Sequence, residues 1–163
     1  MKLYTAEYFI KNLDLEGHVE GGYYKETYRN PFPFKDERGE RALSTTIYYL
    51  LESGQVSKLH KLNSDEMWFY QYGSPMVIHT IDENGIYKAL HLGLDFEKGQ
   101  NPQILVPANV VFGAEPLNED SFSLVSCMVS PGFDYRDFTL YGAEELCNMF
   151  PHCKDLIIRI NGR

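Results

Sequence analysis

The sequence predicts an all-β fold, a barrel or a two-sheet sandwich, with short helices at its ends. Aromatic residues make up 14% of the 163 residues, and aromatic side chains favour the half-buried surface of a sheet. Between residues 23 and 140, short segments of strand character are separated by turn residues at roughly even spacing. No long helical pattern lies between these segments, so an alternating βαβ arrangement is excluded.

A short helix is expected first, over residues 5–14. Thr5 suits the N-cap position, and the carboxylate of Glu7 suits the positive end of the helix. The apolar face of this helix would consist of Phe9, Ile10 and Leu13.

Ten strands are expected next, at 23–28, 43–51, 57–62, 67–72, 76–81, 86–92, 103–106, 110–114, 122–129 and 135–140. The pair Asn84-Gly85 between the fifth and sixth of them predicts a type I′ hairpin turn. The chain then becomes helical again over residues 143–150, and over 155–160 after a start at Pro151. There is no repeat, low-complexity tract or linker, so residues 1–163 are expected to form a single domain.

Charge and composition restrict the possible partners and location. The formal net charge is −8 and no basic patch is visible, which excludes nucleic acid as an expected partner. The chain opens without a basic and then apolar segment, and no apolar stretch approaches the ~20 residues that a membrane helix needs. We therefore expect a cytoplasmic protein with no membrane partner, in which Cys127, Cys147 and Cys153 are reduced thiols. Their spacing does not suit a structural zinc site.

The most informative motif begins at Gly54 and ends at Gly73. It runs Gly, five residues, His60-x-Leu62, three residues, Glu66, six residues, Gly73. His60 and Leu62 are two apart on one expected strand, so their side chains point to the same face. Glu66, Trp68 and Tyr70 likewise share one face of the next strand.

This motif resembles the first cupin motif in every spacing, with Leu62 in place of its second His. Further segments resemble one cupin subfamily in the same order along residues 13–160: His18–Arg29, Ser44–Leu51, Ser64–Glu66, Pro102–Ala108 and Pro131–Phe138. The subfamily is the RmlC-like cupins of unknown function, also known as the fifth cupin family. The resemblance implies a jelly-roll cupin barrel with a small-molecule pocket in its interior. It also implies a homodimer, in which some of the many aromatic side chains would cover the interface.

The resemblance also implies where a metal would bind. Metal-binding cupins have three His and one Glu, of which only His60 and Glu66 remain, because Leu62 and Phe112 replace two histidines. A transition metal generally needs at least three protein ligands. No cofactor is therefore expected. A divalent metal would need Glu20, His79 or His91 as an additional ligand.

Without a metal, His60 is the natural acid or base, because the pKa of histidine lies near neutral pH. The metal-free epimerases of the cupin superfamily are similar in using a His base and a Tyr acid. This chain offers Tyr48, Tyr49 and Tyr70, and Tyr70 is preferred because it shares a face with Glu66. The expected catalytic residues are thus His60, Glu66 and Tyr70.

Four residues are candidates for ligand binding. Trp68 offers an apolar platform for a sugar or another ring, and Gln103 precedes a buried strand. Lys58 and Arg29 are candidate contacts for an anionic group. The leading function is a small-molecule binder or a metal-free isomerase or epimerase, acting on a sugar-like or carbonyl-bearing substrate. A metal-dependent oxygenase or isomerase and a non-catalytic ligand-binding module remain open.

Overall fold

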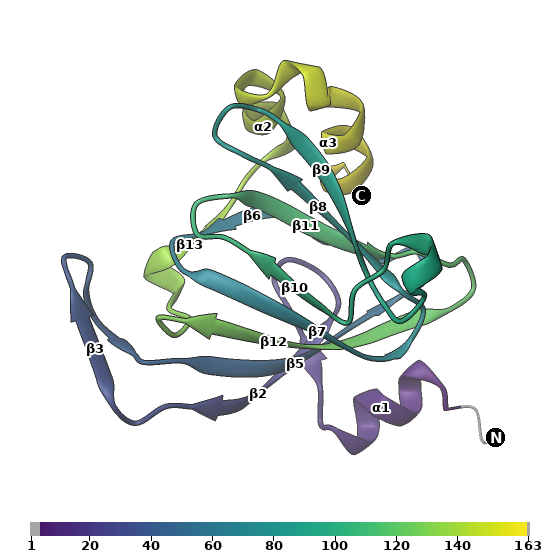
Figure 1. The fold of residues 1–163 in the computed structure, drawn as a ribbon, viewed down its shortest axis with the longest axis horizontal. Coiled ribbons are helices and arrows are strands. Elements are labelled where there is room, and N and C mark those ends of the chain that lie inside the picture. Colours follow the sequence, from purple (N-terminus) through teal and green to yellow (C-terminus); the bar gives the residue numbers. More distant parts are fainter. Residues whose placement is uncertain (1–3, 163) are drawn as a thin grey trace.

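Two antiparallel β-sheets face each other in the computed structural model, which describes residues 4–162 (Figure 1). The larger sheet contains, in spatial order, β1 (Glu16–Gly17), β2 (Tyr23–Arg29), β5 (Thr45–Glu52), β12 (Phe122–Ser130), β7 (Asp65–Gly73) and β10 (Gln103–Val106). The smaller sheet contains β13 (Phe138–Leu140), β6 (Ser57–Leu62), β11 (Val111–Pro116), β8 (Met76–Ile81) and β9 (Tyr87–Leu92). The expectation of a mostly β, jelly-roll arrangement is confirmed.

The main core lies between the two sheets. Inward-facing side chains alternate with outward-facing ones along the strands, as the two-residue period of a strand requires. The largest fully buried side chains between the sheets are Trp68, Tyr49 and Phe112. Aromatic residues therefore supply much of the apolar area that holds the sheets together.

The expected helices are present and cover the outer faces of the sheets. Helix α1 (Ala6–Asn12) begins at Thr5, whose Oγ1 accepts a hydrogen bond from the amide of Tyr8 at 3.2 Å. It packs on the outer face of the larger sheet. Helices α2 (Ala143–Met149) and α3 (Lys154–Asn161), with a 3₁₀ turn at Pro151–Cys153 between them, pack on the smaller sheet.

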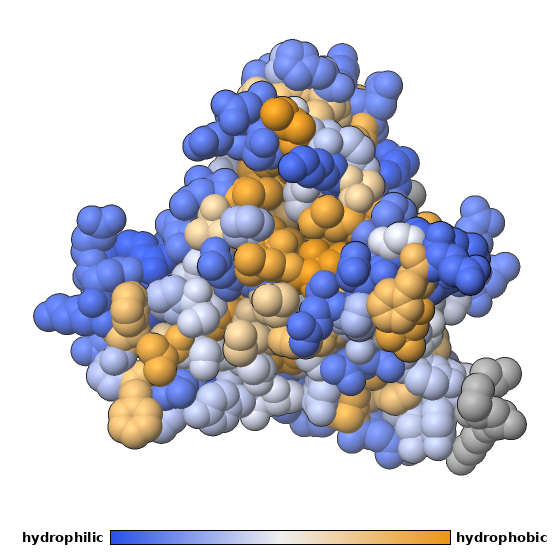
Figure 2. Space-filling model, in the orientation of Figure 1, coloured by the Kyte–Doolittle hydropathy of each residue, from blue (hydrophilic) through white to orange (hydrophobic). Residues whose placement is uncertain are grey.

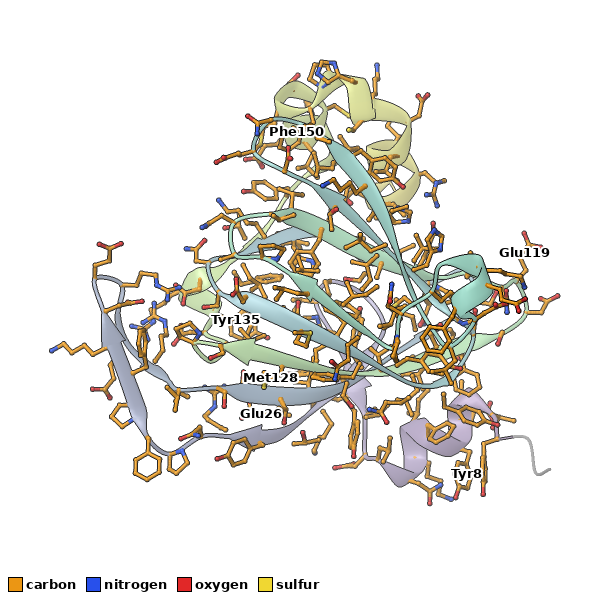
Figure 3. All side chains as sticks on the ribbon, in the orientation of Figure 1. Tyr8, Glu26, Glu119, Met128, Tyr135 and Phe150 are labelled. Carbon is orange, nitrogen blue, oxygen red and sulfur yellow. The ribbon has the colours of Figure 1, made fainter. Side chains whose placement is uncertain are left out.

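Figure 3 labels Phe150, which lies at the end of the molecule formed by α2 and α3. No helix among residues 4–162 is both long and apolar enough to cross a membrane.

A hairpin that the sequence did not predict projects from one side of the molecule (Figure 1). It consists of β3 (Pro33–Asp36) and β4 (Gly39–Ala42). Its residues are largely charged and show no apolar alternation, which explains why no strand was expected here. The hairpin is fixed by a buried ion pair, in which Nε and Nη2 of Arg41 donate to the carboxylate of Asp137 at 2.7 and 3.0 Å.

Two local predictions were wrong. The turn at Asp82–Gly85 places only Gly85 at positive φ, and Gly85 donates its amide to the carbonyl of Asp82. This is a type I turn followed by a glycine in the left-handed region, not a type I′ turn, although β8 and β9 pair as expected. The last strand begins at Phe138, because Tyr135–Asp137 form a 3₁₀ turn that Asp134 caps.

Candidate functional site

A pocket opens between the two sheets, and strands β2, β5, β6, β7, β12 and β13 contribute side chains to it. The pairing register of the strands explains which side chains lie next to each other in the pocket lining. Thr45, Val129 and Glu66 are neighbours across β5, β12 and β7, and Leu62 and Phe138 are neighbours across β6 and β13. The lining residues are His18, Glu20, Tyr24, Glu26, Thr45, Ile47, His60, Leu62, Glu66, Cys127, Val129, Phe133 and Phe138.

A tight loop before β2 brings two polar side chains, those of His18 and Glu20, to the pocket lining. Gly21 and Gly22 have φ values of +114° and +72°, in a region that favours glycine. A Cβ at Gly21 would lie 2.1 Å from the carbonyl oxygen of Val56, so the loop approaches the Val56 backbone too closely for any side chain at this position. This close approach directs His18 and Glu20 into the pocket.

Glu20 pairs with His60 across the pocket wall. Its Oε2 lies 3.3 Å from Nε2 of His60, and its Oε1 accepts a hydrogen bond from Oγ of Ser57 at 2.9 Å. Its carbonyl oxygen also accepts the amide of Lys58 at 2.8 Å, which fixes the loop to β6. The His60–Glu20 pair is buried, with 2% of His60 and 7% of Glu20 exposed.

The tautomer of His60 follows from its other contact. Nδ1 lies 2.7 Å from the carbonyl oxygen of Lys58, and a carbonyl only accepts, so Nδ1 carries a proton. The other ring nitrogen, Nε2, therefore faces Oε2 of Glu20 at 3.3 Å. The rings of Phe112 and Phe138 hold the imidazole in place, with centroid separations of 4.1 and 5.3 Å.

Glu66 provides a second, different carboxyl group in the same pocket. It makes no ion pair with any residue in the described part of the chain. Burial, and after it the negative charge of Glu20, raise the pKa of Glu66 to about 8. At neutral pH Glu66 is therefore a carboxylic acid, with one O–H donor and one acceptor oxygen.

His18 is a further polar group at the pocket. Its Nδ1 accepts the amide of Glu20 at 3.3 Å, and its ring meets that of Tyr24 edge to face at 4.6 Å. Burial lowers the pKa of His18, with the charge of Glu20 acting in the opposite direction. The imidazole is therefore neutral at pH 7, with its proton on Nε2.

The structure brings His60 and Glu66 together as predicted, but not Tyr70. Tyr70 shares the inner face of β7 with Glu66, four residues and thus about 13 Å further along the strand. Its hydroxyl donates to the carbonyl of Gly73 at 2.7 Å, away from the pocket. The structure therefore does not place this Tyr beside His60, and the buried carboxyl group that lines the pocket with His60 is that of Glu66.

The expected ligand-binding residues also lie outside the pocket lining. Trp68 lies in the core between the sheets, outside the pocket lining. It is fully buried against Tyr49 and Phe112, so its ring offers no free face to a ligand. Gln103 is exposed on β10, and the side chain of Lys58 does not line the pocket. Arg29 lies at an adjacent surface groove.

Two residues of the candidate site have only a weak signal in the sequence. The sequence indicates Glu20 as one possible extra metal ligand, and it indicates His18 only as part of a segment that resembles the cupin subfamily. Each is four or fewer residues from the glycine pair Gly21-Gly22, which marks a sharp turn. Nothing in the spacing shows that this turn folds over a strand some forty residues away. His79 and His91 lie on β8 and β9 outside the pocket lining, so neither completes a set with His60.

The donor set does not fit the four-ligand metal centre that the cupin resemblance implies. Leu62 and Phe112 stand at two of the four positions, and neither carries a donor atom. Among residues 4–162, no three His, Cys, Asp or Glu side chains are arranged to hold a metal ion. The two remaining family ligands, His60 and Glu66, are available instead for hydrogen bonding and proton transfer.

Comparisons with known proteins agree with this fold. The family model described as "Cupin superfamily (DUF985)" matches residues 7–141. The chain is similar to the crystal structure of protein SO0799 from Shewanella oneidensis, with 43% identity, 98% of each chain covered and a TM-score of 0.92. It is also similar to a hypothetical protein from Leishmania major, with 36% identity, 96% and 98% of the two chains covered and a TM-score of 0.91.

A further relative is the uncharacterised protein YML079W from Saccharomyces cerevisiae, with 32% identity over 158 residues. That match covers 87% of this chain and 78% of the relative. With the matched motif and the two facing sheets, these findings show that the chain belongs to the DUF985 family of the cupin superfamily.

Proposed function

We propose that the protein is a metal-independent proton-transfer enzyme, an isomerase or epimerase, that acts at a carbon next to a carbonyl group. The single observation that carries this proposal is the pairing of two unlike carboxyl groups in one pocket. Glu66 is held as an acid by burial, whereas Glu20 accepts from Ser57 and lies 3.3 Å from Nε2 of His60. Environments that separate two carboxyl groups in this way are typical of acid–base sites.

The roles follow from the protons that each group holds. The His60–Glu20 pair starts with one proton in its hydrogen bond and takes up a second, on the Glu20 carboxylate, from the substrate carbon. Glu66 donates its proton to the carbonyl oxygen as the C–H bond breaks, which gives a neutral enol. The enol O–H returns its proton to Glu66 when the carbonyl forms again. The pair then returns a proton to carbon, so that all groups are restored.

Apolar walls assist this chemistry. Ile47, Leu62 and Val129 surround the polar groups, and a water-poor site strengthens each hydrogen bond to the developing charge. His18 presents Nε2–H as an additional neutral donor. General acid–base catalysis by such groups contributes typically 10²–10⁴-fold each.

The test is exchange of carbon-bound hydrogen with solvent. Chelator-treated protein is incubated in D₂O with glycolaldehyde, dihydroxyacetone and glyceraldehyde, and loss of the C–H signals is followed by ¹H NMR. We expect exchange above the uncatalysed rate, reduced at least ~100-fold in His60→Asn, Glu20→Gln and Glu66→Gln. Glu119→Gln, an exposed carboxyl outside the pocket (Figure 3), is the matched control and should retain the rate. Exchange that is absent for all three compounds, or undiminished in the pocket variants, overturns the proposal.

A further inference from the structure

Helix α3 carries a polar residue, Asn161, on the face that packs against the smaller sheet. Ile157 and Ile160 are fully buried on this face, and Asn161, four residues after Ile157, lies on the same side of the helix. Polar side chains instead cover most of the outer surface of the helical end, at the top of Figure 2. A polar group on the packed face of a helix is costly unless it is hydrogen-bonded, so the partners of Asn161 indicate its role.

The side-chain amide of Asn161 bonds to the backbone of β6 and of the residue that follows β13. Its Oδ1 accepts from the amide of Leu59 in β6 at 2.9 Å. Its Nδ2 donates to the carbonyl of Tyr141 at 3.0 Å and, at 3.4 Å, to the carbonyl of Leu59. Strand β13 ends at Leu140, which pairs with His60. The Asn161 amide therefore bridges the next two residues beyond the end of the β13–β6 ladder.

The peptide group between Lys58 and Leu59 connects this amide to the pocket. Its N–H, the amide of Leu59, donates to Asn161. Its C=O, the carbonyl of Lys58, lies 2.7 Å from Nδ1 of His60 and accepts the proton of that nitrogen. A peptide group is planar, so a partner that holds its N–H also fixes the direction of its C=O. Hydrogen bonds at both ends of one peptide group also polarise and strengthen each other.

The same short segment of β6 holds the loop that carries Glu20. The amide of Lys58 donates to the carbonyl oxygen of Glu20 at 2.8 Å, and Nε2 of His60 lies 3.3 Å from the Glu20 carboxylate. The side chains of Leu59 and His60 point to opposite faces of β6. Leu59 is buried in the cluster under α3, whereas His60 lines the pocket. The segment therefore joins the helix-covered face of the smaller sheet to the pocket on its inner face.

We propose that Asn161 is a positioning residue for the pocket, which sets the orientation of His60, and with it the His60–Glu20 contact, through the Lys58–Leu59 peptide group. Asn161 itself lies outside the pocket lining. Without its amide, the N–H of Leu59 loses this acceptor, and the peptide group turns together with the carbonyl that holds Nδ1 of His60. This role does not depend on which reaction the pocket performs, and only its effect on turnover rests on the proposed function.

Hydrogen exchange at Nδ1 of His60 tests the inference. In protein labelled with ¹⁵N-histidine, the Nδ1–H signal of His60 is identified by its loss in His60→Asn, and its exchange with water is followed by ¹H–¹⁵N NMR. Asn161→Leu keeps the approximate shape of the side chain but removes all three hydrogen bonds. We expect it to shift the Nδ1 resonance and to speed Nδ1–H exchange by about tenfold or more, as loss of one ordinary hydrogen bond would. Asn161→Ala should have the same effect, and it carries the test if Asn161→Leu does not fold.

Two controls separate positioning from a general loss of stability. Ile160→Val removes buried apolar volume from the same face of α3, so it should lower the urea midpoint of unfolding without changing the His60 signals. Asn12 is the last residue of α1, as Asn161 is of α3, and its Nδ2 donates within its own helix to the carbonyl of Tyr8 at 2.7 Å. Asn12→Leu should also leave the His60 signals unchanged.

Exchange of substrate C–H bonds is measured on the same variants. At saturating substrate, its rate should fall by about tenfold or more in Asn161→Leu, with the half-saturating concentration within about threefold of wild type. An Nδ1–H exchange rate within about twofold of wild type in both Asn161 variants, or an equal change in Ile160→Val, overturns the inference. If the wild-type protein catalyses no C–H exchange, the proposed function fails, while the His60 signals still decide the role of Asn161.

Discussion

The indole ring of Trp68 lies beside the buried carboxyl of Glu66, on the same face of β7. The indole N–H makes no hydrogen bond with any residue in the described part of the chain. It is nevertheless close enough to oppose, together with Cys127, the rise in the pKa of Glu66. Trp68 is the sole tryptophan of the sequence, so its fluorescence reports the charge of Glu66.

A pH titration of Trp68 fluorescence should therefore show a transition with a midpoint near pH 8. As the pH rises through this value, Glu66 loses its proton, and a carboxylate forms beside the indole. Glu66→Gln should abolish the transition, whereas Glu119→Gln should leave it unchanged. A midpoint below pH 6, or a transition that persists in Glu66→Gln, would contradict the protonated state on which the proposed acid depends.

Substitution of Gly21 should damage the site through the backbone. An Ala Cβ would lie 2.1 Å from the carbonyl oxygen of Val56 at a φ of +114°, so we expect a loss of stability of about 2 kcal/mol or more. Gly99→Ala is the matched control, because Gly99 also has a positive φ, +72°, but open space around its Cβ. It should cost only about 1 kcal/mol. Urea unfolding measures both, and equal costs would show that the close approach at Val56 is unimportant.

Glu115 should make stability depend on acid pH. It accepts from His79 at 3.1 Å and from Arg159, and the first of these hydrogen bonds contributes most to lowering the pKa of Glu115 to about 2. A depressed folded-state pKa stabilises the fold above about pH 4.5, and this contribution is lost as the pH falls toward 2.

Glu115→Gln should therefore be less stable than wild type by about 1–2 kcal/mol at pH 7, after allowing for screening by solvent. The gap should close as the pH falls from 4.5 to 2. Thermal unfolding across that range measures it. A gap that is the same at pH 2.5 and pH 7 would show that His79 and Arg159 do not act on the ionised carboxyl.

Restoration of the two missing histidines should create a metal centre. Leu62 lines the pocket, and Phe112 is the β11 neighbour of His60, so Leu62→His with Phe112→His would complete a three-His, one-Glu set with His60 and Glu66. We expect the double variant to bind Zn²⁺ or Mn²⁺ at least ~100-fold more tightly than wild type.

Calorimetry and elemental analysis measure this gain, with circular dichroism to confirm folding. A His60→Asn substitution on the double-variant background should remove the tight site. Equal metal affinity in wild type and the double variant would mean that Leu62 and Phe112 do not determine metal binding.

The sequence predicted the fold well where the signal is local. Strand alternation, the Thr5 cap and the apolar face of α1 depend on neighbours within a few residues, and the structure confirms them. The strand motif also placed His60 and Glu66 correctly on facing strands. Glu20 was not recognised as the partner of His60, because their contact depends on a loop that crosses to another strand. Tyr70 was chosen only because it shares a face with Glu66, and its hydroxyl instead donates to the carbonyl of Gly73, outside the pocket lining.

The β3–β4 hairpin was missed for a related reason. It is fixed by Arg41 and Asp137, which are 96 residues apart, and an ion pair between distant residues leaves no periodic pattern in the sequence. Local periodicity thus identifies elements, whereas the site depends on contacts between elements.

The residues that line the pocket come from two segments that are far apart in the sequence, residues 18–66 and residues 127–138. A nascent chain that ends before β12 already contains His18, Glu20, His60 and Glu66 but lacks the strand between β5 and β7. Val129 on β12 is the direct neighbour of Glu66 on β7, so β12 contributes to the burial of this carboxyl. The raised pKa of Glu66 therefore depends on a strand that enters the sheet from much later in the chain.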